Sequence, residues 1–322
     1  MDLQRSVSSG GAQMQRTRVT KRPRSPSFST AFIIIGSLFV TLQAQAFSLE
    51  AMSNSSACPS PKKVFVIGAN GKTGHRLVRL LEQNPSYLPT AMVRDPAQGK
   101  RFDDLGVPWV ARDLEMGAPS AADLEGFDAV IFAAGAGRDR PDIKKVSIDY
   151  IGAVRSMAAS QESSSVGRFI LLSGINSDQE GTRRSANASG DDLLGPLSAW
   201  HRLKAHSEAY VRSSHLHGRS IDWTILCPGR LLDDEAGGTG LIKASLIRGE
   251  DDFKDALTPE EKMAAAKSFP GSHDGKMERL CVSRDNTAVA LMALLGAPNT
   301  IGKTITIVDG ILPVGEALSG IA

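Results

Sequence analysis

Cysteine is scarce in this sequence of 322 residues, which contains only Cys58, Cys227 and Cys281. The three lie far apart and form no CxxC pair, and the histidines do not cluster with acidic residues at the spacing of metal ligands. This pattern argues against a disulfide scaffold and against a metal site. We expect Cys227 and Cys281 to be small apolar residues of the core.

The sequence also lacks a strong excess of charge of either sign. Its formal net charge is +2, and residues 1–46 hold six basic residues and one acidic residue. The rest of the chain holds 31 basic and 34 acidic residues, which is a net charge of −3. A body this close to neutral gives no electrostatic reason to expect nucleic-acid binding.

The apolar run at residues 31–40 is too short for a comfortable membrane span. It follows a basic, serine-rich lead and precedes Ala44-Gln45-Ala46, which fits an A-x-A cleavage site. This order predicts a signal peptide, whose removal would leave no stable membrane span in the mature protein. A membrane anchor is the competing interpretation.

Phe47 follows the cleavage site directly, and a serine-rich tract leads from it to Lys63. This pattern resembles the bipartite plastid presequences of diatoms and related algae, in which a phenylalanine follows the signal cleavage point. The resemblance implies delivery to a plastid, with the secretory pathway or a membrane anchor as alternatives. We therefore divide the chain into a presequence and linker, residues 1–61, and a folded domain, residues 62–322.

The central feature of the domain is an apolar run, residues 64–67, followed by a glycine-rich turn and a helical pattern of leucine and valine. This order is typical of the first βαβ unit of a dinucleotide-binding domain. The glycines allow a tight turn, close approach of the backbone to a pyrophosphate, and close packing of the helix, whose free N–H groups face the anion. The alternative for the whole turn is a βα connection that binds no ligand. For Lys72, the alternative to a phosphate contact is a solvated side chain. The residues expected to hold the diphosphate are Gly68, Ala69, Asn70, Gly71, Lys72, Thr73 and Gly74.

The residue that reads the adenine ribose is expected after the second strand, residues 90–93. An acidic residue there would bind the ribose 2′-hydroxyl of NAD, whereas a basic residue suits the 2′-phosphate of NADP. Arg94 comes first at this position, ahead of Asp95, and its planar guanidinium suits a phosphate. The sequence therefore favours NADP over NAD, the alternative being a surface Arg94 paired with Asp95. Asp113 and Leu114 follow the third strand, where the adenine ring would lie.

Strand and helix patterns alternate along the whole domain. This alternation predicts a doubly wound parallel α/β sheet, a Rossmann fold, with ligands at the carboxyl ends of the strands. Small residues at the end of the fourth strand, Ala133, Ala134 and Gly135, would let a cofactor approach the backbone. The expected strands are residues 64–67, 90–93, 109–111, 129–133, 168–173, 221–227 and 305–308, and the expected helices are residues 148–159, 200–211, 258–267 and 284–295.

Two segments without a regular pattern are expected to border the substrate end of the sheet. Residues 174–199 are polar and rich in glycine and serine, and we interpret them as the rim of a pocket. Residues 233–282 are the least regular part of the domain, and we interpret them as a lid. Within this lid, Thr258 and Glu261 predict a capping box at the start of a short helix.

Several motifs coincide with those of one family. They are the glycine turn, Val93-Arg94-Asp95, Asp113-Leu114, Ser173, Lys204 and Pro228-Gly229. Together they resemble the atypical short-chain dehydrogenase/reductases, in particular the NmrA-like and flavin- or biliverdin-reductase-like NAD(P)-binding proteins. The resemblance covers residues 62–310. It implies a single Rossmann domain that binds NADP, in part through Lys204 and Pro228, with the substrate above the carboxyl strand ends.

The resemblance also implies a catalytic arrangement. In active members of the superfamily a serine polarises the substrate carbonyl, a tyrosine donates a proton, and a lysine four residues later holds the nicotinamide ribose. Ser173 and Lys204 match the serine and the lysine, but Trp200 stands at the tyrosine position. Indole has no acidic proton, so we expect Trp200 to pack or to support a flat substrate. The other conceivable proton donors are Ser198, His201, Tyr150 and Tyr210.

These observations leave three functions open. The first is an NADP-dependent reductase that transfers hydride to a small conjugated or aromatic substrate, because some atypical members reduce substrates that need no protein acid. The second is a plastid redox sensor or assembly factor that binds NADP and a protein partner without catalysis, which the presence of Trp200 favours. The third is an epimerase or dehydratase on the same scaffold.

Overall fold

The computed structural model describes residues 60–137, 140–175, 177, 196–233, 240–247, 250–268 and 278–322. All of them belong to one compact unit, Ser60–Ala322. The predicted presequence, Cys58 and most of the loop 174–199 lie outside the described residues, so the signal peptide and plastid delivery stay predictions. Within the described part of the chain, no helix is both long and apolar enough to cross a membrane.

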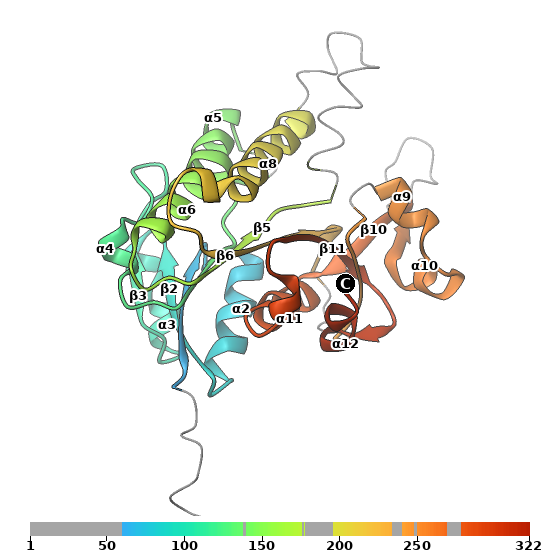
Figure 1. Ribbon diagram of the computed structural model, residues 1–322, viewed down its shortest axis with the longest axis horizontal. Helices are drawn as coiled ribbons and strands as arrows, with labels where there is room; N and C mark the ends of the chain where they lie inside the picture. The colour runs from blue at the N-terminus through green and yellow to red at the C-terminus, as the bar shows by residue number, and fades with distance from the viewer. Residues whose placement is uncertain are drawn as a thin grey trace, which may run out of the picture. The chain divides into compact units, whose positions relative to one another are not determined.

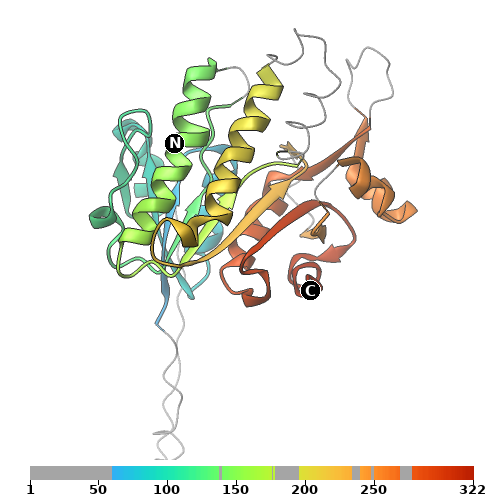
Figure 2. The same cartoon turned by 45° about the horizontal axis from the view of Figure 1, so that its top comes forward.

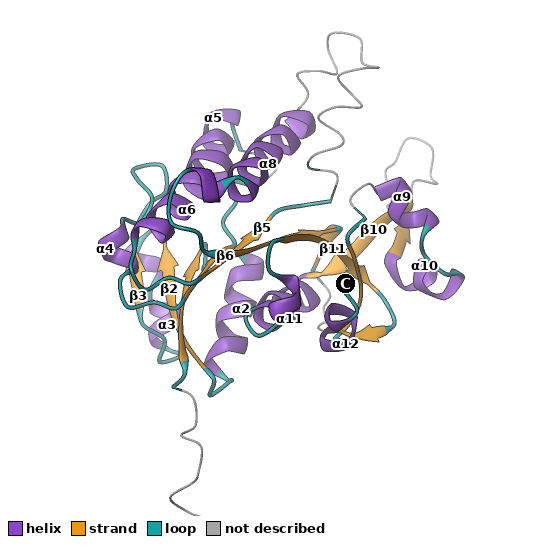
Figure 3. Cartoon of the chain, viewed as in Figure 1, coloured by secondary structure: helices purple, strands orange, loops and turns teal. Residues whose placement is uncertain are grey.

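A mostly parallel sheet forms the centre of the fold, with helices on both of its faces (Figures 1 and 3). Its strand order is β12-β8-β11-β6-β5-β4-β1-β2-β3, and the neighbours from β11 to β3 pair in parallel. The predicted doubly wound α/β fold is therefore confirmed. The strands from β1 to β6 are β1 (Lys62–Ile67), β2 (Tyr87–Val93), β3 (Trp109–Ala111), β4 (Ala129–Phe132), β5 (Arg168–Leu172) and β6 (Asp222–Pro228), and β11 spans Lys303–Asp309.

Strand β1 shows why the apolar run of the sequence is continuous rather than alternating. Val64 and Val66 belong to the core on one face of the sheet, whereas Phe65 and Ile67 belong to the core on the other face. All four side chains are buried. A strand in the middle of a parallel sheet is covered on both sides, so each of its side chains has to be apolar.

The helices form two layers, which Figures 1 and 2 show on opposite faces of the sheet. One layer packs α5, a π-helix, α6 and α8 against one another. The other layer packs α2 against α11 and α11 against α12. The bounds of the first layer are α5 (Asp142–Lys145), the π-helix (Val146–Gly152), α6 (Ala153–Glu162) and α8 (Pro196–Arg212), and those of the second are α2 (Lys72–Glu82), α11 (Arg284–Leu294) and α12 (Val314–Ser319).

Short helical elements fill the connections between these layers. Two of them, α4 and a 3₁₀ turn after β2, begin at side-chain caps supplied by Ser120 and Asp95. Such caps satisfy backbone N–H groups that have no partner inside the helix. The short helices are α3 (Lys100–Asp103) and α4 (Ala121–Leu124), and the 3₁₀ turns are Pro96–Gln98, Ser214–Leu216 and Pro298–Thr300.

The segment 233–282 corrects the sequence-based expectation of an irregular lid. Strand β8 (Leu241–Ser245) enters the main sheet antiparallel to β11, and β12 (Leu312–Pro313) pairs with β8 beyond it. The strand at residues 305–308 is therefore not the last one. The partner of β8 lies some sixty residues further along the chain, and no local pattern reveals so distant a pairing.

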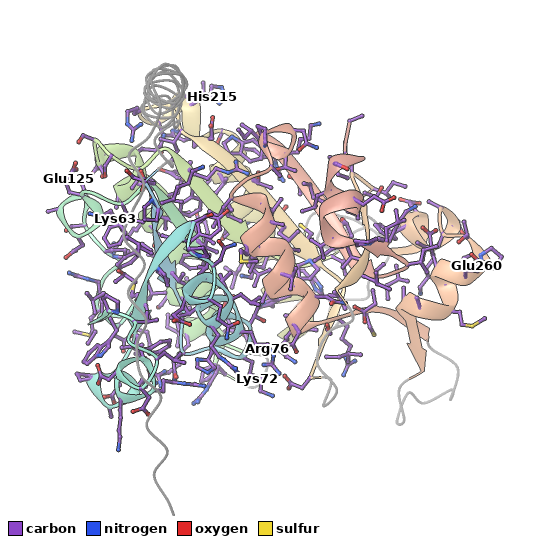
Figure 4. The ribbon with its side chains drawn as sticks, turned by 90° about the horizontal axis from the view of Figure 1, so that it is seen from below. Lys63, Lys72, Arg76, Glu125, His215 and Glu260 are labelled. Atoms are coloured by element: carbon purple, nitrogen blue, oxygen red, sulfur yellow. The ribbon has the colours of Figure 1, made fainter. Side chains whose placement is uncertain are left out.

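The rest of this segment builds a small second sheet and two helices. Strand β10 (Glu278–Ser283) pairs in parallel with β7 (Arg230–Leu232) and antiparallel with β9 (Ala266–Ser268). Because β9 begins at Ala266, helix α10 (Pro259–Ala265) ends before the predicted Lys267. It is preceded by α9 (Glu250–Asp255). In Figure 4 Glu260 of α10 lies at the opposite end of the molecule from Glu125, which follows α4.

The predicted capping box at the start of α10 is present. The backbone N–H of Glu261 donates to the Thr258 hydroxyl at 3.2 Å, and the Glu261 carboxylate accepts from the Thr258 N–H at 2.9 Å. The two remaining cysteines, Cys227 and Cys281, are buried, as expected for core residues.

Candidate functional site

The glycine turn lies between β1 and α2 and is closed by its own backbone. Gly68 adopts a φ of 82°, and a Cβ there would stand 2.6 Å from backbone atoms of Ala134 after β4. A Cβ at Gly74 would stand 2.3 Å from the Gly68 carbonyl oxygen. A side chain is thus excluded at positions 68 and 74 by the close approach of other backbone atoms, which is the packing role expected of these two glycines.

The first turn of α2 fits an anionic group. Gly71 is the N-cap residue and supplies no side-chain acceptor, and the first turn contains no acidic residue. The first N–H groups of a helix have no partner inside it, and the helix dipole favours negative charge at this end. These N–H groups border the cleft described next, so the diphosphate of a dinucleotide would satisfy them.

A cleft of about 870 Å³ runs from this turn along the carboxyl ends of the strands. It brings together most of the predicted cofactor residues and both predicted catalytic ones. Ala69 and Gly74 are instead packed beneath the turn and are not part of the wall. The predicted residues that line the cleft are Gly68, Asn70, Gly71, Lys72, Thr73, Arg94, Asp113, Leu114, Ala133, Ala134, Gly135, Ser173, Lys204 and Pro228.

At the end of β2, where the sequence predicts the adenine ribose, Arg94 is exposed in the cleft wall. Asp95, the next residue, caps a helical turn instead. The Asp95 carboxylate accepts a hydrogen bond from the Ala97 N–H at 2.8 Å and thereby caps the 3₁₀ turn after β2. No ion pair between Arg94 and Asp95 is present in the described part of the chain, and Asp95 is not part of the cleft wall. The position at which the sequence predicts the adenine ribose therefore presents a basic side chain to the cleft.

Helix α8 places a stripe of four side chains along one face, because residues four positions apart lie above one another in a helix. These residues are Trp200, Lys204, Glu208 and Arg212. Trp200 and Lys204 line the cleft, and the Lys204 ammonium stands 5.9 Å from the indole centroid. The tip of the indole ring covers Gly174, where a Cβ would come within 2.7 Å of it. Trp200 thus forms a flat wall at this end of the cleft.

Lys204 is buried and pairs with a carboxylate that the sequence analysis missed. Asp149, fully buried in the π-helix, has Oδ1 at 3.2 Å from Lys204 Nζ, and its Oδ2 accepts from the Ala136 N–H at 3.0 Å. Lys204 Nζ also donates to the Leu172 carbonyl at 3.3 Å. These contacts fix the lysine between the ends of β4 and β5. Segments of π-helix occur frequently at functional sites, but the sequence gives no sign of this one.

Ser173, directly after β5, hydrogen-bonds to a second buried carboxylate. Its Oγ donates to Glu208 Oε1 at 2.5 Å. The same oxygen accepts from the Ser177 hydroxyl, and Cys227 Sγ lies 3.7 Å from it. The Arg212 guanidinium donates to Oε2 at 3.0 Å. Glu208 stands one helical turn after Lys204, and this spacing is the one signal in the sequence that could have identified it.

Lys72, considered above either as a phosphate ligand or as a solvated side chain, is paired. Its ammonium donates to Asp233 Oδ2 at 2.5 Å, and this hydrogen bond holds the pKa of Asp233 below its usual value. Arg76 and Arg284 approach the other oxygen of Asp233 at 3.6 and 3.0 Å. Arg76 also donates to Asp285 at 2.9 Å. Figure 4 shows Lys72 and Arg76 next to each other at the edge of the molecule.

Of the remaining candidate proton donors that the structure describes, His201 lines the cleft and the two tyrosines do not. His201 lines the cleft beside Trp200, with its ring centroid 4.9 Å from that of the indole. Tyr150 and Tyr210 are not part of the wall and instead lie against His206 and His217. The side chain of Ser198 lies outside the described residues.

Comparisons with known proteins agree with this geometry. The sequence profile of the NAD(P)H-binding family matches residues 68–267. The uncharacterised sugar epimerase YhfK of Bacillus subtilis is 30% identical over 258 residues, covering 80% of this chain and 98% of that protein.

Two solved structures share the fold at 24% sequence identity. A putative NAD-dependent epimerase/dehydratase from Bacillus halodurans has a TM-score of 0.60 and covers 80% of this chain and 99% of its own. The oxidoreductase ylbE from Lactococcus lactis has a TM-score of 0.55, with coverages of 80% and 96%. The glycine turn at the start of a Rossmann sheet and the profile that matches from Gly68 onward together establish that the chain belongs to the NAD(P)H-binding family.

Proposed function

We propose that the protein is an NADP-dependent oxidoreductase that exchanges hydride with a small, flat substrate bound beside Trp200. One observation carries this proposal: the glycine turn and the pair Ser173 and Lys204 border the same cleft. A dinucleotide whose diphosphate is bound at the glycine turn would lie along the strand ends, with its nicotinamide toward Ser173 and Lys204. The bound nicotinamide would supply the hydride, and the side chains of the protein would orient the cofactor and the substrate and provide the charged groups that bind them.

The arrangement around Lys204 supports a role in holding the cofactor. Its ammonium is anchored by Asp149 and by the Leu172 carbonyl, which leaves its remaining donor capacity for a ligand in the cleft. A lysine with two fixed partners loses little further conformational freedom when it binds the hydroxyls of a ribose. A solvated surface lysine would not be buried in this way.

The choice of NADP rests on the ribose end. Arg94 is exposed to the cleft, whereas the carboxylate of Asp95 is engaged in capping. A guanidinium binds a phosphate with two parallel hydrogen bonds, and the carboxylate of Asp95, which caps the 3₁₀ turn, is not part of the cleft wall that would meet the 2′-hydroxyl of NAD.

The choice of a flat substrate rests on Trp200. An indole face in the cleft wall gains from offset stacking with a conjugated or aromatic ring. Stacking makes no use of an acidic proton, which the indole lacks.

Binding of NADP without turnover is a second candidate, as in a redox sensor that engages a protein partner. The observation in its favour is that Trp200, rather than a tyrosine, stands one helical turn before Lys204. Epimerase activity, which also uses a bound nicotinamide, is a third candidate function for the same cleft.

Two measurements on the purified protein separate these candidates. Titration calorimetry establishes binding of NADPH, and loss of NADPH absorbance is then followed with quinone, flavin, tetrapyrrole and aryl carbonyl acceptors. We expect turnover of at least one acceptor class, and we expect Trp200→Ala to raise its KM while NADPH binding is retained. Binding of NADPH without turnover across the panel would refute the oxidoreductase and favour the sensor.

A further inference from the structure

Glu208 places a buried carboxylate directly behind the cleft wall. Ser173 is in the wall, whereas Ser177 and Glu208 lie behind it. Both serine hydroxyls donate to Glu208 Oε1, and Arg212 donates to Oε2. Among the residues that the structure describes, the other titratable or charged groups nearby are Cys227 on β6 and, one turn earlier on α8, Lys204 with its partner Asp149. Within this part of the chain, Ser173, Ser177, Arg212 and Cys227 all direct donors at this one side chain.

This arrangement decides which way Ser173 can hydrogen-bond. An ionised carboxylate only accepts hydrogen bonds, and a serine hydroxyl has a single proton. Since the proton of Ser173 is directed at Glu208, only the lone pairs of Ser173 Oγ remain for the cleft. A ligand atom that meets Ser173 from the cleft must therefore be a donor, such as a hydroxyl. This differs from the role implied by the family resemblance, in which the serine donates to a carbonyl.

We propose that Ser173 and Glu208 form a proton relay and that the substrate of this site is a hydroxyl/carbonyl pair. The substrate hydroxyl gives its proton to Ser173 Oγ while Ser173 gives its own proton to Glu208, and the electron pair of the broken O–H bond forms the C=O bond. The C–H hydrogen leaves with its electron pair as hydride to NADP⁺. In the reducing direction the protonated Glu208 returns the proton by the same path.

The relay would take over the task of the missing tyrosine. Ser173 is the catalytic residue, because it touches the substrate, and Glu208 is a positioning residue that acts through it. The contact of Arg212 with Oε2 keeps Oε1 directed at the two serines. This inference rests on the proposed function and deepens it, because a substrate whose reduced form offers no hydroxyl would make no use of the pair.

Ser173→Ala and Ser177→Ala form a matched pair for the test. Each removes one hydroxyl from Glu208 Oε1, but only Ser173 lines the cleft. With NADP⁺ and a panel of aryl alcohols such as 1-phenylethanol, we expect Ser173→Ala to lower kcat by about 10²- to 10⁴-fold, the usual contribution of a positioned acid or base. Ser177→Ala should change kcat little. FMN reduction by NADPH, which needs no such relay, should be unchanged in Ser177→Ala.

Binding supplies a readout that does not depend on turnover. Quenching of tryptophan fluorescence should show that the wild type prefers 1-phenylethanol to acetophenone by roughly 2- to 10-fold, the worth of one hydrogen bond. Ser173→Ala should lose this preference and Ser177→Ala should keep it. Glu208→Gln keeps the acceptor oxygen but cannot take a proton, so it should keep the preference while kcat falls. Glu208→Asp, whose carboxylate can take a proton, should restore part of kcat.

The outcomes distinguish the two levels of inference. Equal losses in Ser173→Ala and Ser177→Ala, or wild-type turnover of FMN but of no hydroxyl/carbonyl pair, would overturn the relay and leave the proposed oxidoreductase standing. Wild-type protein that binds NADPH but turns over no probe would remove the proposed function and the relay with it. If circular dichroism shows that Glu208→Gln does not fold, the comparison of Ser173→Ala with Ser177→Ala is sufficient to test the relay.

Discussion

The two ends of the cleft are constructed in different ways. At the glycine turn, which we call the diphosphate end because the diphosphate is proposed to bind there, the groups offered to a ligand are backbone N–H groups that follow one strand within a few residues. At the substrate end, they are side chains from β5, the π-helix and α8, and two buried carboxylates hold them in place. The first end depends on the absence of side chains, and the second depends on charge pairs buried in the correct geometry. The two ends should therefore fail in different ways when mutated.

The largest effect is expected at the diphosphate end from Gly74→Val. A Cβ there would stand 2.3 Å from the Gly68 carbonyl oxygen, and the branched side chain would separate α2 from the turn. We expect a loss of more than about 5 kcal/mol in the free energy of unfolding, comparable to the whole stability of many domains. Expression and circular dichroism provide the measurement. Gly117→Ala is the matched control, because its Cβ would meet nothing within 4 Å. A folded Gly74→Val protein that binds NADPH would contradict the packing role of this glycine.

The next largest effect is expected at the substrate end from Lys204→Ala. The change leaves Asp149 buried without its cationic partner, which typically costs about 3–5 kcal/mol. Urea denaturation measures the loss, and calorimetry should also show weaker NADPH binding. Lys144→Ala removes an ion pair to Glu115 that is partly exposed, so it should cost at most about 1 kcal/mol. If the two variants lost similar amounts of unfolding free energy, the buried pair would contribute no more to stability than the partly exposed one.

A third prediction concerns the ribose end. Arg94→Asp removes a cation that faces the cleft and adds an anion in its place. We expect the Kd for NADPH to rise by about 10- to 100-fold, the range for a lost hydrogen bond between charged groups, while the Kd for NADH changes little. Calorimetry with both nucleotides is the measurement. Equal weakening of both would refute the role of Arg94 in binding the 2′-phosphate.

The smallest effect is a pH dependence of stability that arises from His75 on α2, the helix that follows the glycine turn. Burial beside Phe102, together with the charges of Arg101, Arg79 and Arg76, lowers the pKa of His75 on α2 to about 4. The unfolded chain takes up this proton near its ordinary pKa of 6.5 and the folded protein only near 4. Stability should therefore fall as the pH is lowered between these values and be unaffected by His75 above them.

Thermal melts across this pH range provide the check. His75→Leu should flatten the slope of melting temperature against pH relative to the wild type. An unaltered slope in His75→Leu would show that other groups account for the acid sensitivity.

The sequence predicts the diphosphate end well because its signals are local. The strand, the three glycines and the helix follow one another within residues 62–82, and Arg94 follows the next strand directly. The substrate end is predicted only in part. Ser173 and Lys204 are found through the family resemblance, but Asp149 and Glu208 are not, because an acidic residue in a helix pattern gives no sign of being buried. Strand β8 is missed for a related reason, since its pairing partner β11 lies far along the chain.

Asp233 has a consequence for how tightly the protein can hold its cofactor. Three cations, Lys72, Arg76 and Arg284, surround this carboxylate, and with Asp285 the group has three positive and two negative charges, which leaves a net charge of +1. A dinucleotide that approaches Lys72 and Arg284 in the cleft therefore competes with an acidic side chain of the protein itself. The contribution of this group of charges to the affinity should vary with ionic strength as though it were about one cation rather than three.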